Sequence, residues 1–261
     1  SNGVASKLER LQARAALEEA RVQARKAEND AVLAQLALER MLKQSGASHW
    51  QLSTPLAVNS QPLPELGSFL SIAMMRHPGL AKVAAKRNQA EQMHEASSAL
   101  QRPQVFAFGQ RYFLDKGHGD WVAGLALRFN LIDSLDHRSL DRASHQQLVQ
   151  ADALAAQARS DISLLVEKQW RAAELSRTQY LSMQVNEDLA QELLRLRQSG
   201  LREGTSTALD LIDSQTNLAK VRTERAQVAY EYVMALAGLL QACGQSEGLS
   251  EYLERADLRL L

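Results

Sequence analysis

The residue types that commonly carry chemistry occur in this chain, but only one pair of them has an informative spacing. The six histidines match neither HExxH nor a similar metal-ligand pattern, and the serines and aspartates form no nucleophile motif. Asp210 and Asp213 are three residues apart and would share one face of a helix. We predict no catalytic residue, no metal site and no cofactor. On spacing alone, the two carboxylates are solvated side chains in the first turns of a helix.

The composition narrows the class of protein further. The chain has 261 residues, with 30 Lys and Arg against 30 Asp and Glu, so its formal net charge is zero. A protein held to nucleic acid by phosphate contacts would carry a basic excess, so we expect no nucleic-acid partner. The single cysteine, Cys243, excludes an internal disulfide. No apolar run approaches the roughly 18 residues of a membrane-spanning helix.

Glycine and proline divide the chain into the elements that must position these residues. All five prolines lie between Pro55 and Pro103, and proline is the strongest helix breaker. The pattern predicts six segments: a helix over 3–44, a linker over 45–66, helical residues over 67–102 with a break at Pro78, a non-helical segment over 103–133, a long helical hairpin over 134–244 with its tip at 200–204, and a tail over 245–261.

The long helical segment carries a heptad pattern. Residues of the predicted seam recur in steps of three and four at Leu148, Ala151, Ala155, Ala158, Ile162 and Leu165. This 3.5-residue period is typical of a coiled coil, and its alanines allow two helices to approach closely. Gly200 and Gly204 bracket a turn that would fold the last two helices into an antiparallel pair. Periodicity by itself favours a generic coiled coil.

Residues 103–133 contain two runs with strand character. The first run, 104–114, and the second, 121–131, are each about 10 residues long and alternate in side-chain type. Residues 115–120 form a polar, glycine-containing loop between them. A membrane β-strand has this length and this alternation.

Two interpretations of this hairpin are open. The first is an ordinary hairpin packed on a soluble core. The second is a hairpin inserted in a membrane, where neighbouring copies must close the sheet because lipid does not tolerate open sheet edges. A single hairpin between very long helices favours the second interpretation. The residues predicted to face the membrane are Phe106, Phe108, Tyr112, Trp121, Leu125, Leu127 and Phe129.

The first and last long helices are similar to each other at an offset of 201 residues. The matched pairs, aligned without gaps, include Gly3 with Gly204, Leu17 with Leu218, Arg21 with Arg222, Val32 with Val233 and Leu38 with Leu239. Because the alignment keeps its register from Gly3 to Leu38 without a gap, it favours an internal duplication of the sequence. We expect the chain to begin just after a turn equivalent to 200–204, without the helix and hairpin that would precede that turn in a first repeat.

Several segments of the chain resemble the TolC family of bacterial outer-membrane efflux and secretion channels. The resemblance is carried by 204–218 with Arg222, by 229–240, by 76–80, by 129–133 and by Pro103 before the first strand. It covers the second of the family's two repeats and the end of the first. It implies a mainly α fold of long antiparallel coiled-coil helices of the α-barrel type, with one β-hairpin contributing to a membrane β-barrel. The family usually has glycines just after the hairpin, where this chain has Ser134 and Leu135.

The resemblance also implies roles for individual residues. Asp210 and Asp213 match positions at which the family places carboxylates at the periplasmic mouth of the channel, where three copies would form rings of negative charge that favour cations. The tips match surfaces that meet a periplasmic adaptor protein, and they comprise Gly3, Val4, Leu201, Arg202, Glu203, Gly204 and Thr205. Each tip residue is also compatible with a helix–helix turn that has no partner.

The function implied by the resemblance is passive transport. The chain is predicted to be the outer-membrane channel component of a tripartite efflux or type I secretion system, located in the bacterial outer membrane and periplasm. Small molecules or polypeptides would pass through a homotrimer in contact with outer-membrane lipid, a periplasmic adaptor (membrane fusion) protein and an inner-membrane pump. The alternatives are a periplasmic adaptor, which would need many short strands, and a coiled-coil scaffold without a pore, which would not account for the hairpin.

Overall fold

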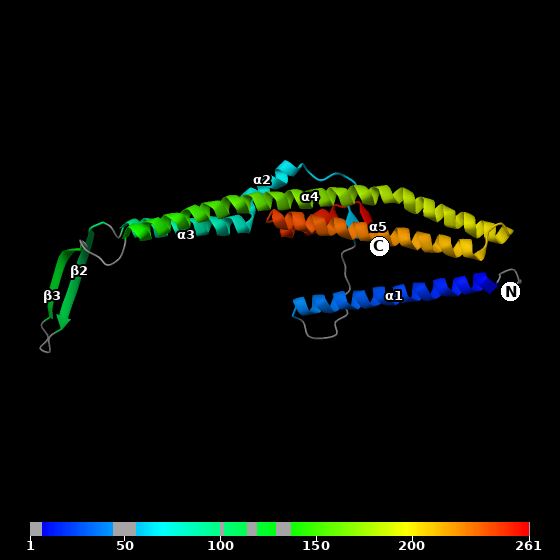
Figure 1. The fold of residues 1–261 in the computed structure, drawn as a ribbon, viewed down its shortest axis with the longest axis horizontal. Helices are drawn as coiled ribbons and strands as arrows, with labels where there is room; N and C mark the ends of the chain where they lie inside the picture. Colours follow the sequence, from blue (N-terminus) through cyan, green and yellow to red (C-terminus); the bar gives the residue numbers. More distant parts are fainter. Residues whose placement is uncertain (1–6, 44–55, 100–101, 114–118, 129–136, 261) are drawn as a thin grey trace. The chain divides into compact units, whose positions relative to one another are not determined.

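A computed structural model describes residues 7–43, 56–99, 102–113, 119–128 and 137–260. The elements are α1 (Lys7–Met41), β1 (Leu56–Val58), α2 (Leu66–Arg76), α3 (Pro78–Ala99), β2 (Gln104–Phe113), β3 (Gly119–Arg128), α4 (His137–Glu203), α5 (Ala208–Ala242), a 3-10 turn (Ser246–Gly248), α6 (Leu249–Glu254) and β4 (Leu258–Leu260). Figure 1 labels α1 to α5, β2 and β3. Within the described ranges, no helix is both long enough and apolar enough to cross a lipid bilayer.

The chain divides into two compact units. The first comprises 1–63, 169–238 and 247–261, and the second comprises 64–168 and 239–246. The first unit therefore holds α1, the small sheet and most of the α4–α5 hairpin. The second holds α2, α3, the long β-hairpin and the first half of α4.

Helix α4 is 67 residues long, which is about 100 Å at 1.5 Å per residue. The predicted seam is its least exposed face as far as Ile162, which is 8% exposed. Leu165 does not belong to that face, because its side chain is 41% exposed, whereas Val166 is fully buried. A step of four residues after Ile162 replaces the predicted step of three. The mixture of steps keeps the seam on one side of a helix that repeats every 3.6 residues.

Helix α5 returns antiparallel beside α4, as the sequence predicts (Figure 1). Its inner face is buried at Leu218, Val228 and Tyr232. Further along, a Cβ atom placed on Gly238 would lie 2.9 Å from the side-chain amide carbon of Gln169 on α4. The absence of a side chain at this position thus allows close contact between the two helices.

Helix α1 has the bounds that the duplication predicts. The offset of 201 converts Lys7 and Met41 into Ala208 and Ala242, which are the bounds of α5, and both helices have 35 residues. The observed elements therefore agree with the repeat at the level of helix length.

A small sheet in the first unit was not predicted. Strands β1 and β4 pair antiparallel, with Leu56 opposite Leu260 and Val58 opposite Leu258. Val58 is fully buried. The segment predicted as an irregular linker over 45–66 therefore contains a buried strand, and the tail predicted over 245–261 supplies its partner.

The residues that follow β1 are held against α4 by polar contacts. The Leu63 backbone N–H donates to the Glu174 carboxylate at 2.6 Å, and the Arg177 guanidinium donates to the Ser60 carbonyl at 2.8 Å. The Ser60 N–H in turn donates to Asp257 at 2.8 Å, and hydrogen bonds from Ser60 lower the pKa of Asp257. These contacts explain how a proline-containing segment is ordered on a helix surface.

In the second unit, Pro78 opens α3, where the missing N–H is not needed. The His77 side chain precedes it and accepts a hydrogen bond from the Gly79 N–H at 3.0 Å. The predicted break at Pro78 therefore separates α2 from α3. Near the end of α5, Cys243 is fully buried with its sulfur 3.5 Å from the Phe69 carbonyl oxygen, and burial raises the pKa of the thiol. This environment fits the predicted packing role.

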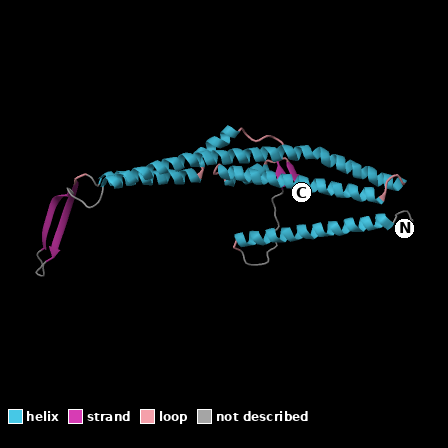
Figure 2. Ribbon diagram, in the orientation of Figure 1, coloured by secondary structure: helices cyan, strands magenta, loops and turns pink. Residues whose placement is uncertain are grey.

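Strands β2 and β3 form the predicted hairpin as a separate two-stranded sheet (Figure 2). They pair antiparallel from Gln104 opposite Arg128 to Phe113 opposite Gly119. Each strand has ten residues, close to the predicted length, but β3 begins at Gly119, so 119 and 120 belong to the strand and not to the predicted loop over 115–120. The predicted segment over 103–133 extends beyond the described residues at 114–118 and 129–133.

Candidate functional site

The turn between α4 and α5 forms the tip of the helical hairpin. Helix α4 continues through Gly200 to Glu203, so the turn comprises 204–207 rather than the predicted 200–204. Gly204 has a φ of 76°, in the left-handed region that favours glycine. The Thr205 N–H donates to the Gly200 carbonyl at 2.7 Å, and the Gly204 N–H donates to the Leu201 carbonyl at 3.4 Å. This pair of hydrogen bonds is a Schellman motif, which satisfies the last carbonyls of α4.

Gly200 has a different role from Gly204. It is buried, and a Cβ atom there would overlap the hydroxyl oxygen of Ser206. The first glycine therefore makes room for the returning chain, and the second permits the reversal. Both roles are consequences of the tight tip that the sequence predicts.

Asp210 caps the start of α5. Its carboxylate accepts hydrogen bonds from the Thr207 N–H at 2.9 Å and the Thr207 hydroxyl at 2.7 Å, while the Asp210 N–H donates back to the same hydroxyl at 3.1 Å. This is a reciprocal capping box. The hydrogen bonds from Thr207 lower the pKa of Asp210, with a further contribution from Arg197, whose guanidinium lies 3.9 Å away.

Asp213 lies one turn further along α5 and is exposed. Because Asp210 is engaged in its own helix start, Asp213 is the carboxylate of the pair better placed to act on a solute. The predicted role of both residues in a channel mouth stays a prediction.

The predicted adaptor-contacting residues of the second tip all lie at the exposed end of the hairpin. Leu201 is 39% exposed, and Arg202, Glu203, Gly204 and Thr205 are also exposed. Gly3 and Val4 lie outside the described residues. The second tip thus presents a free surface, and contact with a partner there remains a prediction.

A charged cluster between α4 and α5 was missed by the sequence analysis. The Glu187 carboxylate accepts hydrogen bonds from Arg225 at 2.6 Å and from Arg222 at 2.9 Å. The Arg225 guanidinium also stacks on the Tyr180 ring, with 4.5 Å between its central carbon and the ring centroid. The hydrogen bond from Arg225 is the main cause of a lowered pKa at Glu187.

This cluster could have been located from the turn. In an antiparallel hairpin, contacting residues lie at similar sequence distances from the turn, and Glu187 and Arg225 satisfy that condition. Since both side chains are mostly buried, we expect the pair to disfavour other registers of α4 against α5.

A second polar cluster joins α3 and α4. The His94 Nδ1 atom lies 3.0 Å from the Ser144 hydroxyl and 3.7 Å from the Asp141 carboxylate. Ser97 and Ser98 of α3 extend the cluster through contacts with Ser144 and Asp141 at 2.8 and 3.0 Å. A Ser-His-Asp relay needs the two partners on different ring nitrogens. Both partners lie on one nitrogen here, so the cluster has the geometry of an interhelical contact.

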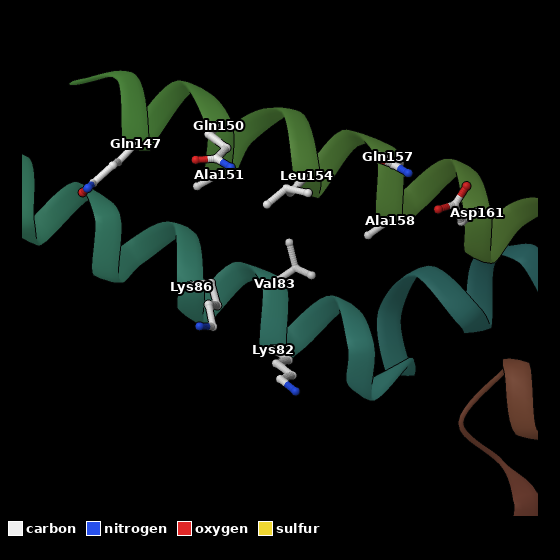
Figure 3. Close-up of a pocket in the computed structure, with 10 residues that line it drawn as sticks. All are labelled: Lys82, Val83, Lys86, Gln147, Gln150, Ala151, Leu154, Gln157, Ala158 and Asp161. Atoms are coloured by element: carbon white, nitrogen blue, oxygen red, sulfur yellow. The ribbon is translucent and has the colours of Figure 1, made fainter. Parts of the chain in front are cut away.

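Figure 3 shows an open groove of about 530 Å³ between α3 and α4. Val83 and Leu154 point toward each other across it, while Lys82 and Lys86 point away from α4. Ala151 and Ala158 are the small residues of the lining on the α4 side. Its polar lining residues are Lys82 and Lys86 on α3 and Gln147, Gln150, Gln157 and Asp161 on α4. Among the described residues, no group of three or more His, Cys, Asp or Glu side chains is placed to hold a metal ion.

The register of the β-hairpin changes the predicted membrane-facing set. Directly opposed residues share a face, and the register defines two faces. The mixed face comprises Gln104, Phe106, Phe108, Gln110, Tyr112, Asp120, Val122, Gly124, Ala126 and Arg128. The apolar face comprises Val105, Ala107, Gly109, Arg111, Phe113, Gly119, Trp121, Ala123, Leu125 and Leu127.

The predicted set combines residues from both faces. Phe106, Phe108 and Tyr112 lie on the mixed face, whereas Trp121, Leu125 and Leu127 lie on the apolar face. These six residues cannot all face lipid, because successive side chains of a strand point to opposite sides of the sheet. The prediction treated each strand by itself, without the register that relates them. Phe129 lies outside the described residues.

The amino-acid sequence matches the model of a family described as outer membrane efflux protein over residues 69–245. This match covers more than half of the chain, and the chain belongs to the outer membrane efflux protein family. The predicted family, the predicted fold class and the predicted outer-membrane location are confirmed. The family is one of transport channels and not a class of enzymes. A comparison with curated proteins found no match.

Solved structures of outer-membrane channels share the fold. The Campylobacter jejuni CmeC outer membrane channel has 15% identity and a TM-score of 0.72, with 97% of this chain and 56% of that chain covered. The open state of the Neisseria gonorrhoeae MtrE outer membrane channel has 17% identity and a TM-score of 0.77, with 94% and 57% covered. The Vibrio cholerae outer membrane protein VceC has 15% identity and a TM-score of 0.70, with 93% and 59% covered. The chain thus spans between 56% and 59% of these structures.

Proposed function

We propose that the chain forms part of the outer-membrane duct of an exporter that works as a tripartite efflux or type I secretion system. The observation that carries the proposal is a β-hairpin that lies in the chain between long helices. Each of its strands has ten residues, and one face of the hairpin is apolar and exposed. Helix α4, which follows it, has 67 residues and is far longer than the helices of a typical globular domain. Membership of the outer membrane efflux protein family supports it. The transported material is small molecules or polypeptides that cross the periplasm and outer membrane.

Transport through this duct is passive. The duct works with an inner-membrane pump that supplies the energy and with a periplasmic adaptor that contacts the exposed tip at Leu201–Thr205. A homotrimer closes the barrel, because the described two-stranded hairpin has open sheet edges that lipid does not tolerate. In the trimer, Asp213, with a smaller contribution from Asp210, forms a ring of negative charge at the periplasmic mouth.

Planar lipid bilayers test the proposed duct. The protein expressed from its complete reading frame, purified in detergent, should give discrete conductance steps. A variant with Leu125→Arg and Leu127→Arg places charge on the apolar face of the hairpin and should insert poorly. Wild-type protein that remains a soluble monomer and gives no conductance would contradict the proposal.

A further inference from the structure

We propose that the mixed face of the β-hairpin lines the channel lumen, and that Arg128 and Phe106 form a contact site there for anionic aromatic solutes. The inference rests on the proposed function, because a lumen exists only if the hairpin closes into a barrel. It adds a solute-binding site in the barrel and reassigns Phe106 and Phe108 from lipid to lumen.

The apolar face has the side chains that lipid requires. Val105, Trp121, Leu125 and Leu127 are 69%, 75%, 79% and 69% exposed in the isolated chain. Burial of these side chains in hydrocarbon is favourable, since each exposes most of its apolar surface to water. Arg111 is the charged residue of this face, and it lies opposite Trp121 toward the loop end of the hairpin. Cations and tryptophans are commonly placed at that height, where a membrane meets water.

The mixed face has side chains that lipid disfavours. Gln104, Gln110 and Arg128 occur along its described length. Gln104 and Arg128 lie at the end of the hairpin, where a charge facing lipid costs least, whereas Gln110 lies within β2. Polar side chains are ordinary in a water-filled lumen, and the mixed face lacks the continuous apolar side chains of the other face. The alternation of the two strands therefore directs this face inward.

Arg128 and Phe106 form a defined pair at the end of the hairpin nearest the helices. The central carbon of the Arg128 guanidinium lies 5.5 Å from the centroid of the Phe106 ring, within the range of a cation–π contact. The Phe106 side chain nevertheless remains 43% exposed. The arginine thus holds a ring whose remaining surface is open to a solute.

Phe108 extends this aromatic surface by one position. A Cβ atom placed on Gly124 would lie 3.0 Å from the Phe108 ring, so the ring lies over the glycine of the opposite strand. Phe108 is 50% exposed, and Phe106 and Phe108 share one face. Two exposed rings beside a cation form a surface unlike the polar wall of a simple water-filled duct.

The guanidinium of Arg128 supplies a positive charge beside the Phe106 ring. The pair therefore attracts an anion, while the rings favour a flat aromatic body, and an aromatic sulfonate or carboxylate satisfies both.

Cysteine accessibility tests the orientation of the two faces. Ala126 on the mixed face and Ala107 on the apolar face are both exposed alanines, so Ala126→Cys and Ala107→Cys are matched changes. The natural cysteine, Cys243, is fully buried and gives little background. In bilayer recordings of the protein from its complete reading frame, an anionic methanethiosulfonate reagent should reduce the current of Ala126→Cys and leave that of Ala107→Cys unchanged. The reverse pattern would overturn the assignment of the faces.

Block by 2-naphthalenesulfonate tests the binding site. We expect partial block of the wild-type current, with methanesulfonate as a control that lacks the ring and blocks weakly. Arg128→Gln and Phe106→Ala should each weaken the block about five-fold, and Arg128→Lys should weaken it less than Arg128→Gln. Leu127→Ala, on the apolar face beside Arg128, should leave the block unchanged.

The outcomes separate the two proposals. Channels that conduct but show equal block in wild type, Arg128→Gln and Phe106→Ala would overturn this inference and leave the duct intact. Absence of any conductance from the wild-type protein would overturn the proposed function itself.

Discussion

Helices α1 and α5 have the same length and the same ends at an offset of 201, yet their side chains have different environments. Leu17 in α1 is 50% exposed, whereas Leu218, the equivalent leucine in α5, is 7% exposed. The fully buried Leu239 likewise corresponds to Leu38, which is half-buried. Helix length and register follow from the local sequence, whereas burial depends on a second helix against which the apolar face can pack.

The C-terminal ends of the two helices show how far the similarity extends. The Lys43 N–H donates to the Arg40 carbonyl at 3.1 Å, and the Gly244 N–H donates to the Gln241 carbonyl at 3.0 Å. Lys43 and Gly244 have φ values of 52° and 67°. The same left-handed cap is therefore formed by a lysine in one repeat and by a glycine in the other. Only at Gly244 does a neighbouring backbone also exclude a side chain, since a Cβ atom there would lie 2.8 Å from the Arg76 carbonyl oxygen.

The largest expected contrast concerns the paired leucines. Leu218→Ala should lower the free energy of unfolding of the purified chain by about 2–5 kcal/mol, because it leaves a cavity in the α4–α5 contact. Leu17→Ala should change it by less than about 1 kcal/mol, because the side chain is half exposed. Urea unfolding followed by far-UV circular dichroism measures both values. Equal losses would show that α1 is as well packed as α5.

The caps should respond to substitution with opposite signs. Gly244→Ala should destabilise the chain by about 1–3 kcal/mol, since it combines an unfavourable φ with contact against the Arg76 carbonyl. Lys43→Gly should stabilise it by about 0.5–1 kcal/mol, because relief of the left-handed strain exceeds the entropic cost of glycine. The same unfolding experiment measures both changes. A loss of stability in Lys43→Gly would contradict the equivalence of the two caps.

Arg21 and Arg222 are equivalent in the two helices, but removal of their glutamate partners should change the free energy of unfolding by different amounts. Arg222 contacts the mostly buried Glu187, whereas Arg21 contacts Glu18 with both side chains more than half exposed. Glu187→Gln should lower the free energy of unfolding by about 1–3 kcal/mol, because Arg225 loses a charged partner. Glu18→Gln should change it by less than about 0.5 kcal/mol.

The Glu187 cluster also has a pH dependence with a definite sign. The pKa of Glu187 in the folded state is lowered from its ordinary value of 4.5. The ionised carboxylate therefore contributes fully to the free energy of unfolding above pH 4.5, and this contribution is lost as the pH falls through the lowered folded-state pKa. Unfolding midpoints measured from pH 7 to pH 3 should therefore decline less steeply at the acidic end in Glu187→Gln than in wild type. Parallel profiles would exclude Glu187 as a source of acid sensitivity.

The smallest expected effect concerns charge at the tips. The offset places Gln12 of α1 at the position equivalent to Asp213 of α5, so the second tip carries a carboxylate that the first lacks. In the complete channel, Asp213→Asn should reduce cation preference about two-fold, and Gln12→Glu should increase it, with both effects weakened by salt. Reversal potentials under a KCl gradient measure the preference. An unchanged reversal potential in Asp213→Asn would remove this residue from the proposed mouth.

Features set by local sequence could be predicted. The long stretch without glycine or proline predicts α4, and the steps between Leu148 and Ile162 predict the face that it buries. Residues 104–128 predict a hairpin because their alternation and loop chemistry are local. The family resemblance rested on such segments, and the family match confirms it.

Features that depend on pairing could not be predicted from single segments. Strand β1 has three residues in a proline-rich stretch, and its partner β4 lies about 200 residues later. The contact of Glu187 with Arg225 can be predicted only when the register of the two helices is known. The placement of Phe106 and Leu125 on opposite faces of the hairpin can be predicted only when the register of the two strands is known. The capping role of Asp210 was within reach, because Thr207 stands three residues before it in a capping-box spacing.

In the proposed duct, the hairpin lies in the outer membrane and closes with its copies, while the long helices extend into the periplasm. Electron cryomicroscopy of the complete protein in lipid nanodiscs can show both features at once. We expect three copies whose hairpins form one closed sheet within the lipid disc, with Leu125 and Leu127 facing lipid and the tip at Gly204 away from the disc. A hairpin packed against its own helices outside the lipid, in a particle with one copy, would exclude the proposed duct.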